Sequence, residues 1–416
     1  MTIASEGPAA RPGRHAGARG DGAPPLPLAG IRVLEFCHTI MGPAAGLLLA
    51  DLGADVIKIE PAEGDRTRRL AGFAAGFFHS FNRNKRSLAI DIKSADGLAL
   101  IQRLARRADV VLENFAPGTM TRLGCDHAAL AGTNPRLIYC ELKGFLSGPY
   151  QHRPALDEVV QFMSGLAYMT GPPGQPLRAG SSVVDIMGGM FAVIAVQAAL
   201  RERDSTGRGQ LVRSALYESA TFLMMQHMAG QAVTGEAPPP MPARRGAWAI
   251  YETFATADGE QMFIGITSDN HWRRFCEKFE LQDLLADPRY ARNEDRVRER
   301  DTIRPIVARI AARHDVAALA EVLEAIGLPF SPVRRPGDLF DDPQLNADGR
   351  LLVTEFPDGT RAGLPRLPVE MGQHDFGLRR QAPRIGEHTR EILLEAGLDD
   401  PQIDALDARG IVTVAA

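Results

Sequence analysis

Short apolar runs alternate with longer stretches of helical periodicity along the first half of the chain. A strand over residues 31–36, a helix from Gly42 through Leu52 and a strand over residues 54–60 form a βαβ unit, which requires parallel strands. The alternation continues, with strands expected at 87–92, 109–113, 137–142 and 210–216 and helices at 94–107, 126–132, 186–200 and 218–232. The pattern predicts an α/β fold with a large Rossmann-like domain built on a parallel sheet.

The periodicity changes after a proline-rich segment that is typical of a linker. Beyond it, Asp258-Gly259 separates two apolar runs, which indicates a β-hairpin, and helical stretches follow. The last part of the chain has too little apolar periodicity for an independent core. We therefore expect a disordered tail at 1–27, the N-terminal part of the large domain at 28–232, a linker at 233–247, a small α+β domain at 248–329 and a C-terminal part at 330–416 that returns to the large domain.

The composition argues against several classes of function. The net charge of −4 gives no global positive field for nucleic acid. The four cysteines have neither CxxC nor metal-ligand spacing and are typical of reduced thiols, so we expect a cytoplasmic protein without a metal. The longest apolar run, 186–200, falls short of a bilayer span, and residues 1–27 lack the apolar core of a signal peptide. No membrane association is expected.

A carboxylate at a helix start is the main candidate for chemistry. The expected strand at 137–142 leads through a Gly/Pro loop into an apolar helix with Asp157 at its mouth. Asp157 is either the N-cap of that helix or a nucleophile kept ionised by the helix end. Asp185 precedes another apolar helix, and capping is its favoured role. Gly188 and Gly189, in the first turns of that helix, permit close backbone approach.

Several cations lie at or near the ends of the expected strands. Singly, each is typical of a solvated surface group, but together they indicate a ligand rich in phosphate. They are Lys85, Lys93, Arg122 and Lys143. The first βα loop, 37–42, lacks GxGxxG, so the dinucleotide fingerprint is absent. A helix N-terminus still follows the first strand at the usual ligand position of an open α/β sheet.

Seven motifs together resemble one family. They lie in the same order and at similar spacing, and they are found at 49–60, 82–87, 113–118, 134–139, 148–150 with Asp157, 206–210 and 386–389. On these motifs the chain resembles the class III CoA-transferases, which include formyl-CoA, carnitine and benzylsuccinate CoA-transferases and α-methylacyl-CoA racemases. The resemblance covers about residues 28–396.

The resemblance implies an interlocked homodimer, in which each chain threads through its partner, and a catalytic role for Asp157. In the family the aspartate attacks the acyl-CoA thioester to form a mixed anhydride, and CoA then forms an aspartyl thioester before an acceptor acid takes it. Coenzyme A would be substrate and product, with no tightly bound cofactor. The CoA contacts implied are Thr39, Ile40, Met41, Lys85, Ile90, Lys93, Asn114, Arg122 and Lys143.

The resemblance does not identify the acids between which CoA would be exchanged. Residues 240–248 lack the glycine run with which formyl-CoA transferases cover their intermediate, so that specificity does not carry over. A small dicarboxylate such as succinate, mesaconate or itaconate would need an arginine partner, from Arg68, Arg69, Arg153, Arg244 and Arg245. The expected substrate contacts are His38, Arg153, Tyr168 and Arg244.

Two other functions remain open at this point. An α-methylacyl-CoA racemase would use Asp157 and a histidine as an acid/base pair. Racemases tend to have histidine directly before this aspartate, where this chain has Leu156, although His127 and His152 are possible partners. A catalytically inactive CoA-binding protein is the third possibility, against which the presence of Asp157 and the cations argues.

Overall fold

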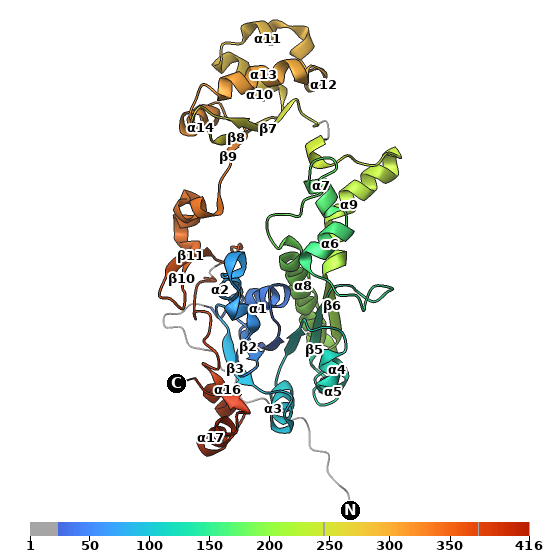
Figure 1. The fold of residues 1–416 in the computed structure, drawn as a ribbon, viewed down its shortest axis with the longest axis vertical. Helices are drawn as coiled ribbons and strands as arrows, with labels where there is room; N and C mark the ends of the chain where they lie inside the picture. The colour runs from blue at the N-terminus through green and yellow to red at the C-terminus, as the bar shows by residue number, and fades with distance from the viewer. Residues whose placement is uncertain (1–23, 244–245, 373, 416) are drawn as a thin grey trace, which may run out of the picture. The chain divides into compact units, whose positions relative to one another are not determined.

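A computed structural model describes residues 24–243, 246–372 and 374–415 of the chain (Figure 1). Internal contacts divide the described chain into two units. The first unit runs to Pro240 and resumes at Gln344, and the second is Met241–Pro343. Each unit has its own hydrophobic core, so each is described separately.

A sheet with the strand order β12-β3-β2-β1-β4-β5-β6 organises the first unit. Its strands are β1 (Arg32–Phe36), β2 (Asp55–Glu60), β3 (Arg86–Ile90), β4 (Val110–Glu113), β5 (Ile138–Lys143), β6 (Leu211–Ala215) and β12 (Val412–Thr413). Neighbouring strands are parallel, apart from β12, which pairs antiparallel with β3. The predicted α/β fold with a mostly parallel sheet is therefore confirmed.

The strand order reverses at β1. The chain proceeds outward from β1 to β2 and β3 and then returns to β4 on the other side. Because β1 and β4 are parallel neighbours, with Phe36 opposite Glu113, their carboxyl ends lie side by side. Ligands of open α/β sheets bind at such a switch point. The segments 37–40 and 114–118, which carry predicted site residues, leave the sheet here.

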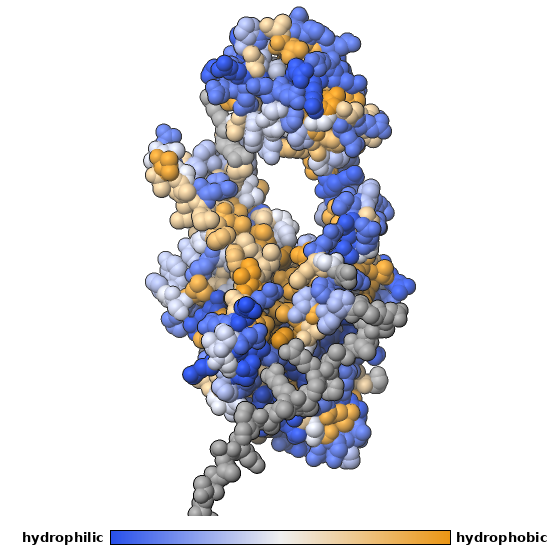
Figure 2. All heavy atoms as spheres, turned by 180° about the vertical axis from the view of Figure 1, so that it is seen from behind, coloured by the Kyte–Doolittle hydropathy of each residue, from blue (hydrophilic) through white to orange (hydrophobic). Residues whose placement is uncertain are grey.

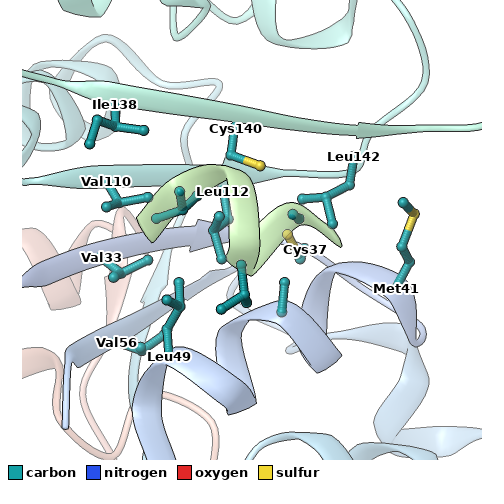
Figure 3. Close-up of a cluster of buried hydrophobic side chains, with 14 of the residues drawn as sticks. Val33, Cys37, Met41, Leu49, Val56, Val110, Leu112, Ile138, Cys140 and Leu142 are labelled. Carbon is teal, nitrogen blue, oxygen red and sulfur yellow. The ribbon is translucent and has the colours of Figure 1, made fainter. Parts of the chain in front are cut away.

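Helices cover both faces of this sheet. Those of the first unit are α1 (Met41–Asp51), α2 (Phe77–Phe81), α3 (Ala95–Ala105), α4 (Thr119–Arg122), α5 (His127–Ala131), α6 (Asp157–Met163), α7 (Leu166–Thr170), α8 (Val183–Thr206), α9 (Leu216–Thr234), α15 (Pro343–Asn346), α16 (Thr389–Glu395) and α17 (Asp400–Ala408). Alternate residues of β5, Ile138, Cys140 and Leu142, lie on the face covered by α1 and α8 (Figure 3). Residues of α3, α16 and α17 pack on the other face, so the C-terminal segment belongs to the first unit.

Helices α1 and α8 pack closely because of two glycines. A Cβ at Gly189 would lie 2.8 Å from the carbonyl oxygen of Met41, and one at Gly188 would lie 2.6 Å from the Met41 Cε. The predicted close approach is confirmed. By length and composition, α8 is the one helix of the described ranges that could cross a membrane, but here it packs against α1, β5 and β6.

Ordered structure begins before the predicted residue 28. Residues 1–23 of the expected tail lie outside the described residues. Leu26 packs against Gly53, its carbonyl accepts the N–H of Ala29 at 2.9 Å, and Leu28 N donates to Leu52 O at 2.9 Å. The end of the expected tail thus belongs to the first unit, because Leu26 finds an apolar contact beside α1.

The second unit combines a small antiparallel sheet with helices. Its strands are β7 (Ile250–Ala255), β8 (Gln261–Ile266) and β9 (Phe330–Pro332), and its helices are α10 (Asp269–Lys278), α11 (Gln282–Ala286), α12 (Asn293–Arg298), α13 (Arg300–Ala311) and α14 (Val316–Ala325). Asp258-Gly259 turns between β7 and β8, as the hairpin signal predicts. The expected end of this unit at residue 329 is too early. Strand β9 still pairs with β8, and the chain leaves the unit only after Pro343. A further two-stranded sheet, β10 (Leu351–Glu355) with β11 (Arg361–Pro365), follows in the first unit.

Candidate active site

Asp157 is the first residue of α6 and is 7% exposed. The N-cap position is Leu156, which has no side-chain cap. The Asp157 carboxylate is instead directed at the first turn of α8, where Oδ2 accepts the N–H groups of Val184 at 2.9 Å and Asp185 at 3.0 Å. The N-cap interpretation is therefore wrong for α6. Asp157 caps a different helix, whose N-terminus stabilises its negative charge.

The other carboxylate oxygen of Asp157 has an amide donor. Gln161, one turn further along α6 and fully buried, donates its Nε2 to Asp157 Oδ1. Gln161 is held in turn, because its Oε1 accepts the Ala179 N–H at 2.8 Å. Among the described residues, no lysine, arginine or histidine forms an ion pair with Asp157. All three donors to this buried carboxylate are thus neutral.

Asp185 lies beside this carboxylate as a second acid. It occupies the first turn of α8, whose N-cap is Ser182, and in the described part of the chain its carboxyl group has no hydrogen bond. The favoured capping role of Asp185 is therefore not what the structure shows. Burial, together with the negative charge of Asp157, raises the pKa of Asp185 to about 7. Asp185 can consequently hold a proton near neutral pH.

The loop after β1 is held from two sides. Asn114, after β4, accepts the His38 N–H with Oδ1 at 3.0 Å and donates Nδ2 to the His38 carbonyl at 2.8 Å. The His38 ring stacks on Phe115 at 5.8 Å between ring centroids. Thr39 donates its N–H to Thr67 Oγ1 at 3.0 Å and has a φ of +66°. The predicted residues His38, Thr39 and Asn114 therefore lie together, and Ile40 and Met41 follow as buried residues at the start of α1.

Beneath this loop lies a set of charged residues that we call the buried ion cluster: Glu35, Lys58, Asp65 and Lys85. Lys85 Nζ lies 2.6 Å from Glu35 Oε2, and Lys58 Nζ lies 3.5 Å from Glu35 Oε1 and 2.8 Å from Asp65 Oδ2. Burial, followed by the charge of Glu35, raises the pKa of the adjacent Cys37 thiol well above its usual value. Cys37 is accordingly a buried apolar group.

Two predicted CoA contacts are corrected by this arrangement. Lys85 is fully buried, with its Nζ also bonded to Pro43 O and Asn82 Oδ1, both at 3.0 Å. It precedes β3, so it starts from the amino edge of the sheet, opposite to the ligand edge. Ile90 is 1% exposed in the hydrophobic core and pairs with Val412. Neither side chain is accessible to CoA here.

Of the remaining predicted cations, Lys143 and Arg122 lie near the loop after β4, and Lys93 lies elsewhere, beyond β3. Lys143, at the end of β5, donates to Glu113 and to the Phe115 carbonyl, at 2.9 Å for the latter, so it lies next to the loop after β4. A pocket of about 150 Å³ adjoins it, lined by Glu113, Gly118, Thr121, His152 and Arg213 among others. Arg122, on α4, is exposed and bonded to Thr119 Oγ1 at 2.9 Å. Lys93 is exposed beyond β3, and no contact among the described residues connects it to this group.

The predicted substrate residues are not gathered at Asp157 by direct contacts. Arg153 is exposed and stacks on the Tyr150 ring at 4.3 Å, and Tyr168 is 49% exposed on α7. Arg244 lies outside the described residues. His152 contacts Gln151, His127 meets the Tyr139 ring edge to face, and neither contacts Asp157. The histidine partner of the racemase alternative is thus absent from the described surroundings of Asp157.

Sequence reasoning missed Gln161, Thr67 and the buried ion cluster. The spacing of four residues between Asp157 and Gln161 on a helix could have identified Gln161. Charged residues inside apolar strands, Glu35 in β1 and Lys58 in β2, were a visible signal of buried pairing. No sequence pattern pointed to Thr67, because it lies 28 residues from Thr39 along the chain and the two meet only in the folded protein.

Comparisons with known proteins agree with one another. The family model described as CoA-transferase family III matches residues 28–389. The succinate–glutarate CoA-transferase of Agrobacterium fabrum is 36% identical over 382 residues, covering 89% of this chain and 95% of that protein. A succinyl-CoA:mesaconate CoA-transferase of Haloarcula hispanica is 33% identical and covers 88% and 96%. The crystal structure of a CAIB/BAIF family protein from Brucella suis superimposes with a TM-score of 0.80 at 33% identity, covering 90% and 100%.

Proposed function

The chain belongs to CoA-transferase family III and is a CoA-transferase, and from this premise we propose that Asp157 transfers CoA from a dicarboxylyl-CoA such as succinyl-CoA to a second small dicarboxylic acid. The observation that carries the proposal is the Asp157 carboxylate, buried and held by three neutral donors. The names of the two relatives reported above supply the class of acid.

The transfer proceeds through two kinds of covalent intermediate. A carboxylate oxygen of Asp157 attacks the thioester carbonyl, the C–S bond breaks, and CoA leaves as a thiolate while a mixed anhydride forms. The thiolate then attacks the Asp157 carbonyl, which releases the first acid as a carboxylate and leaves an aspartyl thioester. The acceptor carboxylate repeats these two steps in reverse, so that Asp157 is regenerated and no water is consumed.

The donors around Asp157 suit both the charged and the acylated state. When the thiolate attacks the Asp157 carbonyl, negative charge develops on the carbonyl oxygen. The Val184 and Asp185 N–H groups, which already bond to Oδ2, are positioned to stabilise that charge. Burial of Asp157 limits hydrolysis of the anhydride by water.

Coenzyme A binds, in this proposal, at the switch point of the sheet. Thr39 and Asn114 contact its nucleotide from the loops after β1 and β4, and Ile40 and Met41, whose side chains are buried, do so through their backbone. Arg122, Lys93 and Lys143 are the cations available for its phosphates, with Lys143 beside the pocket at the ends of β4 and β5. No cofactor beyond CoA itself takes part.

Arg153 is our candidate partner for the distal carboxylate of the dicarboxylic acid. It lies in the loop that leads directly into α6, it is exposed, and within the described ranges it has no acidic partner. A guanidinium binds a carboxylate through two parallel hydrogen bonds. His38 and Tyr168 remain proposed contacts of the acyl group.

An interlocked homodimer is part of the proposal. Large apolar side chains are exposed along α8 and α9, where Figure 2 shows orange surface, and they need a partner surface. They are Met190, Ile194, Phe222, Met225, Met228 and Val233. The four free thiols are buried, and we place the enzyme in the reducing cytoplasm.

The test is mass spectrometry of the protein after incubation with a panel of acyl-CoAs, succinyl-CoA first, followed by hydroxylamine. We expect an acyl or CoA adduct on the peptide containing Asp157, its conversion to a hydroxamate, and its absence in Asp157→Ala. Incorporation of deuterium from D₂O at the acyl Cα without any adduct would overturn the transferase mechanism in favour of racemisation.

A further inference from the structure

Thr39 has an unusual backbone conformation. Its φ of +66° lies in the left-handed region, which a β-branched residue adopts only at an energetic cost. Thr39 stands where the chain leaves β1 and turns into α1, in the loop assigned above to CoA. Such a conformation persists only when surrounding contacts hold it in place.

A chain of buried hydrogen bonds holds this conformation. Thr67 Oγ1 accepts the Thr39 N–H at 3.0 Å and donates to Asp65 Oδ1 at 2.8 Å. Asp65 pairs with Lys58 at 2.8 Å, and Lys58 Nζ donates to the Cys37 carbonyl at 2.8 Å. The hydrogen bonds therefore start and end on the same loop, two residues apart. Lys58, Asp65 and Thr67 are each at most 5% exposed.

The other end of the loop is attached to the same buried ion cluster. Lys85 donates to the carbonyl of Pro43, in the first turn of α1, and pairs with Glu35. Helix α1 approaches Glu35 so closely that a Cβ at Gly46 would lie 1.7 Å from Glu35 Oε2. The cluster thus fixes both ends of the segment, while Thr67 is its contact with the middle.

We propose that Thr67 is a positioning residue for acyl-CoA binding, because its hydroxyl connects the buried ion cluster to the Thr39 N–H and so holds the loop at residues 39–41 in its binding conformation before CoA arrives. The inference rests on the proposed function only in assigning this loop to CoA. A preorganised loop avoids the entropic cost of ordering when the ligand binds. Loss of the Thr67 hydroxyl should accordingly weaken binding and leave the chemistry at Asp157 unchanged.

Thr67→Val removes both hydrogen bonds of the Thr67 hydroxyl, to the Thr39 N–H and to Asp65 Oδ1, and keeps the branched shape of the side chain. The Thr67 N–H also donates to Asp65 Oδ1, at 2.9 Å, and this backbone bond survives the substitution. Thr67→Ser keeps the hydroxyl and is the rescuing variant. Thr354→Val is a matched control, because Thr354 is an equally buried threonine in β10, away from this loop.

The experiment measures CoA binding by calorimetry, the KM for acyl-CoA, and the amount of Asp157 adduct at saturating acyl-CoA. For Thr67→Val we expect Kd and KM to rise about tenfold, because the Thr39 N–H loses its acceptor and the loop loses its connection to the buried ion cluster, with kcat and adduct yield unchanged. Thr67→Ser and Thr354→Val should match the wild type in Kd and KM. If Thr67→Val does not fold, Thr67→Ala, which is smaller and cannot clash, takes its place.

Wild-type affinity for CoA in the hydroxyl-lacking variant, or a fall in kcat with KM unchanged, would overturn the inference while leaving the adduct on Asp157 intact. Failure of the wild type to form any adduct would overturn the proposed function instead. The calorimetric comparison of wild type and Thr67→Val for free CoA does not depend on that outcome.

Discussion

Two buried carboxylates of the first unit, Glu35 and Asp157, have opposite surroundings. Glu35 is fully buried between the ammonium groups of Lys85 and Lys58, at 2.6 and 3.5 Å. Asp157 is nearly as buried, but its partners are two backbone N–H groups and one amide, all neutral. The two carboxylates have the same charge and a similar depth, and they differ in what balances that charge.

Under the proposed mechanism, this difference favours acylation of Asp157 over acylation of Glu35. Acylation removes the negative charge of a carboxylate. At Glu35 this would leave the buried Lys85 ammonium group without a counter-ion, at a cost of several kcal/mol, and would leave Lys58 paired with Asp65 alone. At Asp157 the same neutral donors can bond to the carbonyl oxygen of an anhydride or thioester, so the charge can disappear and return. Neutral donors therefore suit a carboxylate nucleophile, and cations suit a structural carboxylate.

Replacement of the proposed nucleophile should have the largest effect on activity. We expect Asp157→Asn to reduce CoA transfer roughly a thousandfold or more, because an amide oxygen does not attack a thioester effectively. The Asn oxygen can still accept the Val184 and Asp185 N–H groups, so the protein should remain folded. Steady-state exchange between succinyl-CoA and glutarate, with circular dichroism as the folding control, tests this. Activity within tenfold of the wild type would contradict it.

Replacement of the structural carboxylate should affect stability instead. Glu35→Gln leaves Lys58 and Lys85 without one buried counter-charge, and we expect it to lower the free energy of unfolding by about 3–5 kcal/mol. Glu158→Gln is the control, because Glu158 pairs with Arg178 on the surface, where a pair contributes less than about 1 kcal/mol. Urea denaturation measures both. Equal losses in the two variants would remove the distinction between buried and exposed pairing.

The fold was predictable from the sequence because the apolar periodicity of β1, α1 and β2 is a local signal. Asp157 was identifiable as a candidate site residue for the same reason, since it stands at a strand–loop–helix junction and within a family motif. Its hydrogen-bond partners were not, because Val184 and Asp185 are 27 and 28 residues away along the chain. Local spacing therefore suggested the N-cap of its own helix, whereas tertiary packing made it the cap of α8.

Lys85 is a second case in which the sequence did not reveal the partners of a side chain. A cation beside a strand is visible in the sequence, but the direction of its side chain depends on which acids the neighbouring strands present. Glu35 in β1 meets Lys85, which precedes β3, across the intervening strand β2. The strand order is a property of the whole chain, so the buried ion cluster could be suspected from the charges in β1 and β2 but not assembled.

The second acid beside Asp157 should make the stability of the protein depend on pH. Folding raises the pKa of Asp185 from 3.8 to about 7, through burial and then through the charge of Asp157. Between these values the folded protein binds more protons than the unfolded chain, so stability falls as pH rises from about 4 to 7 and is level above. Asp185→Asn should abolish this decline, which we expect to be about 2 kcal/mol because the side chain is partly accessible to water. Urea denaturation at several pH values compares the two proteins, and parallel profiles would contradict the prediction.

The smallest effect concerns one of the three neutral donors. Gln161→Met removes the donor to Asp157 Oδ1 and leaves both backbone donors to Oδ2, so we expect adduct formation to slow by about tenfold, far less than in Asp157→Asn. Some stability is also lost, because the Ala179 N–H loses its acceptor. Gln210→Met is the matched control, since it removes an exposed hydrogen bond from the Gln210 side-chain amide to Glu202, outside the site. Quench-flow measurement of adduct formation compares Gln161→Met with the control. An unchanged rate in Gln161→Met would contradict the prediction. It would mean that the backbone N–H groups of α8 alone hold the Asp157 carboxylate, and that the Gln161 amide only supports the fold.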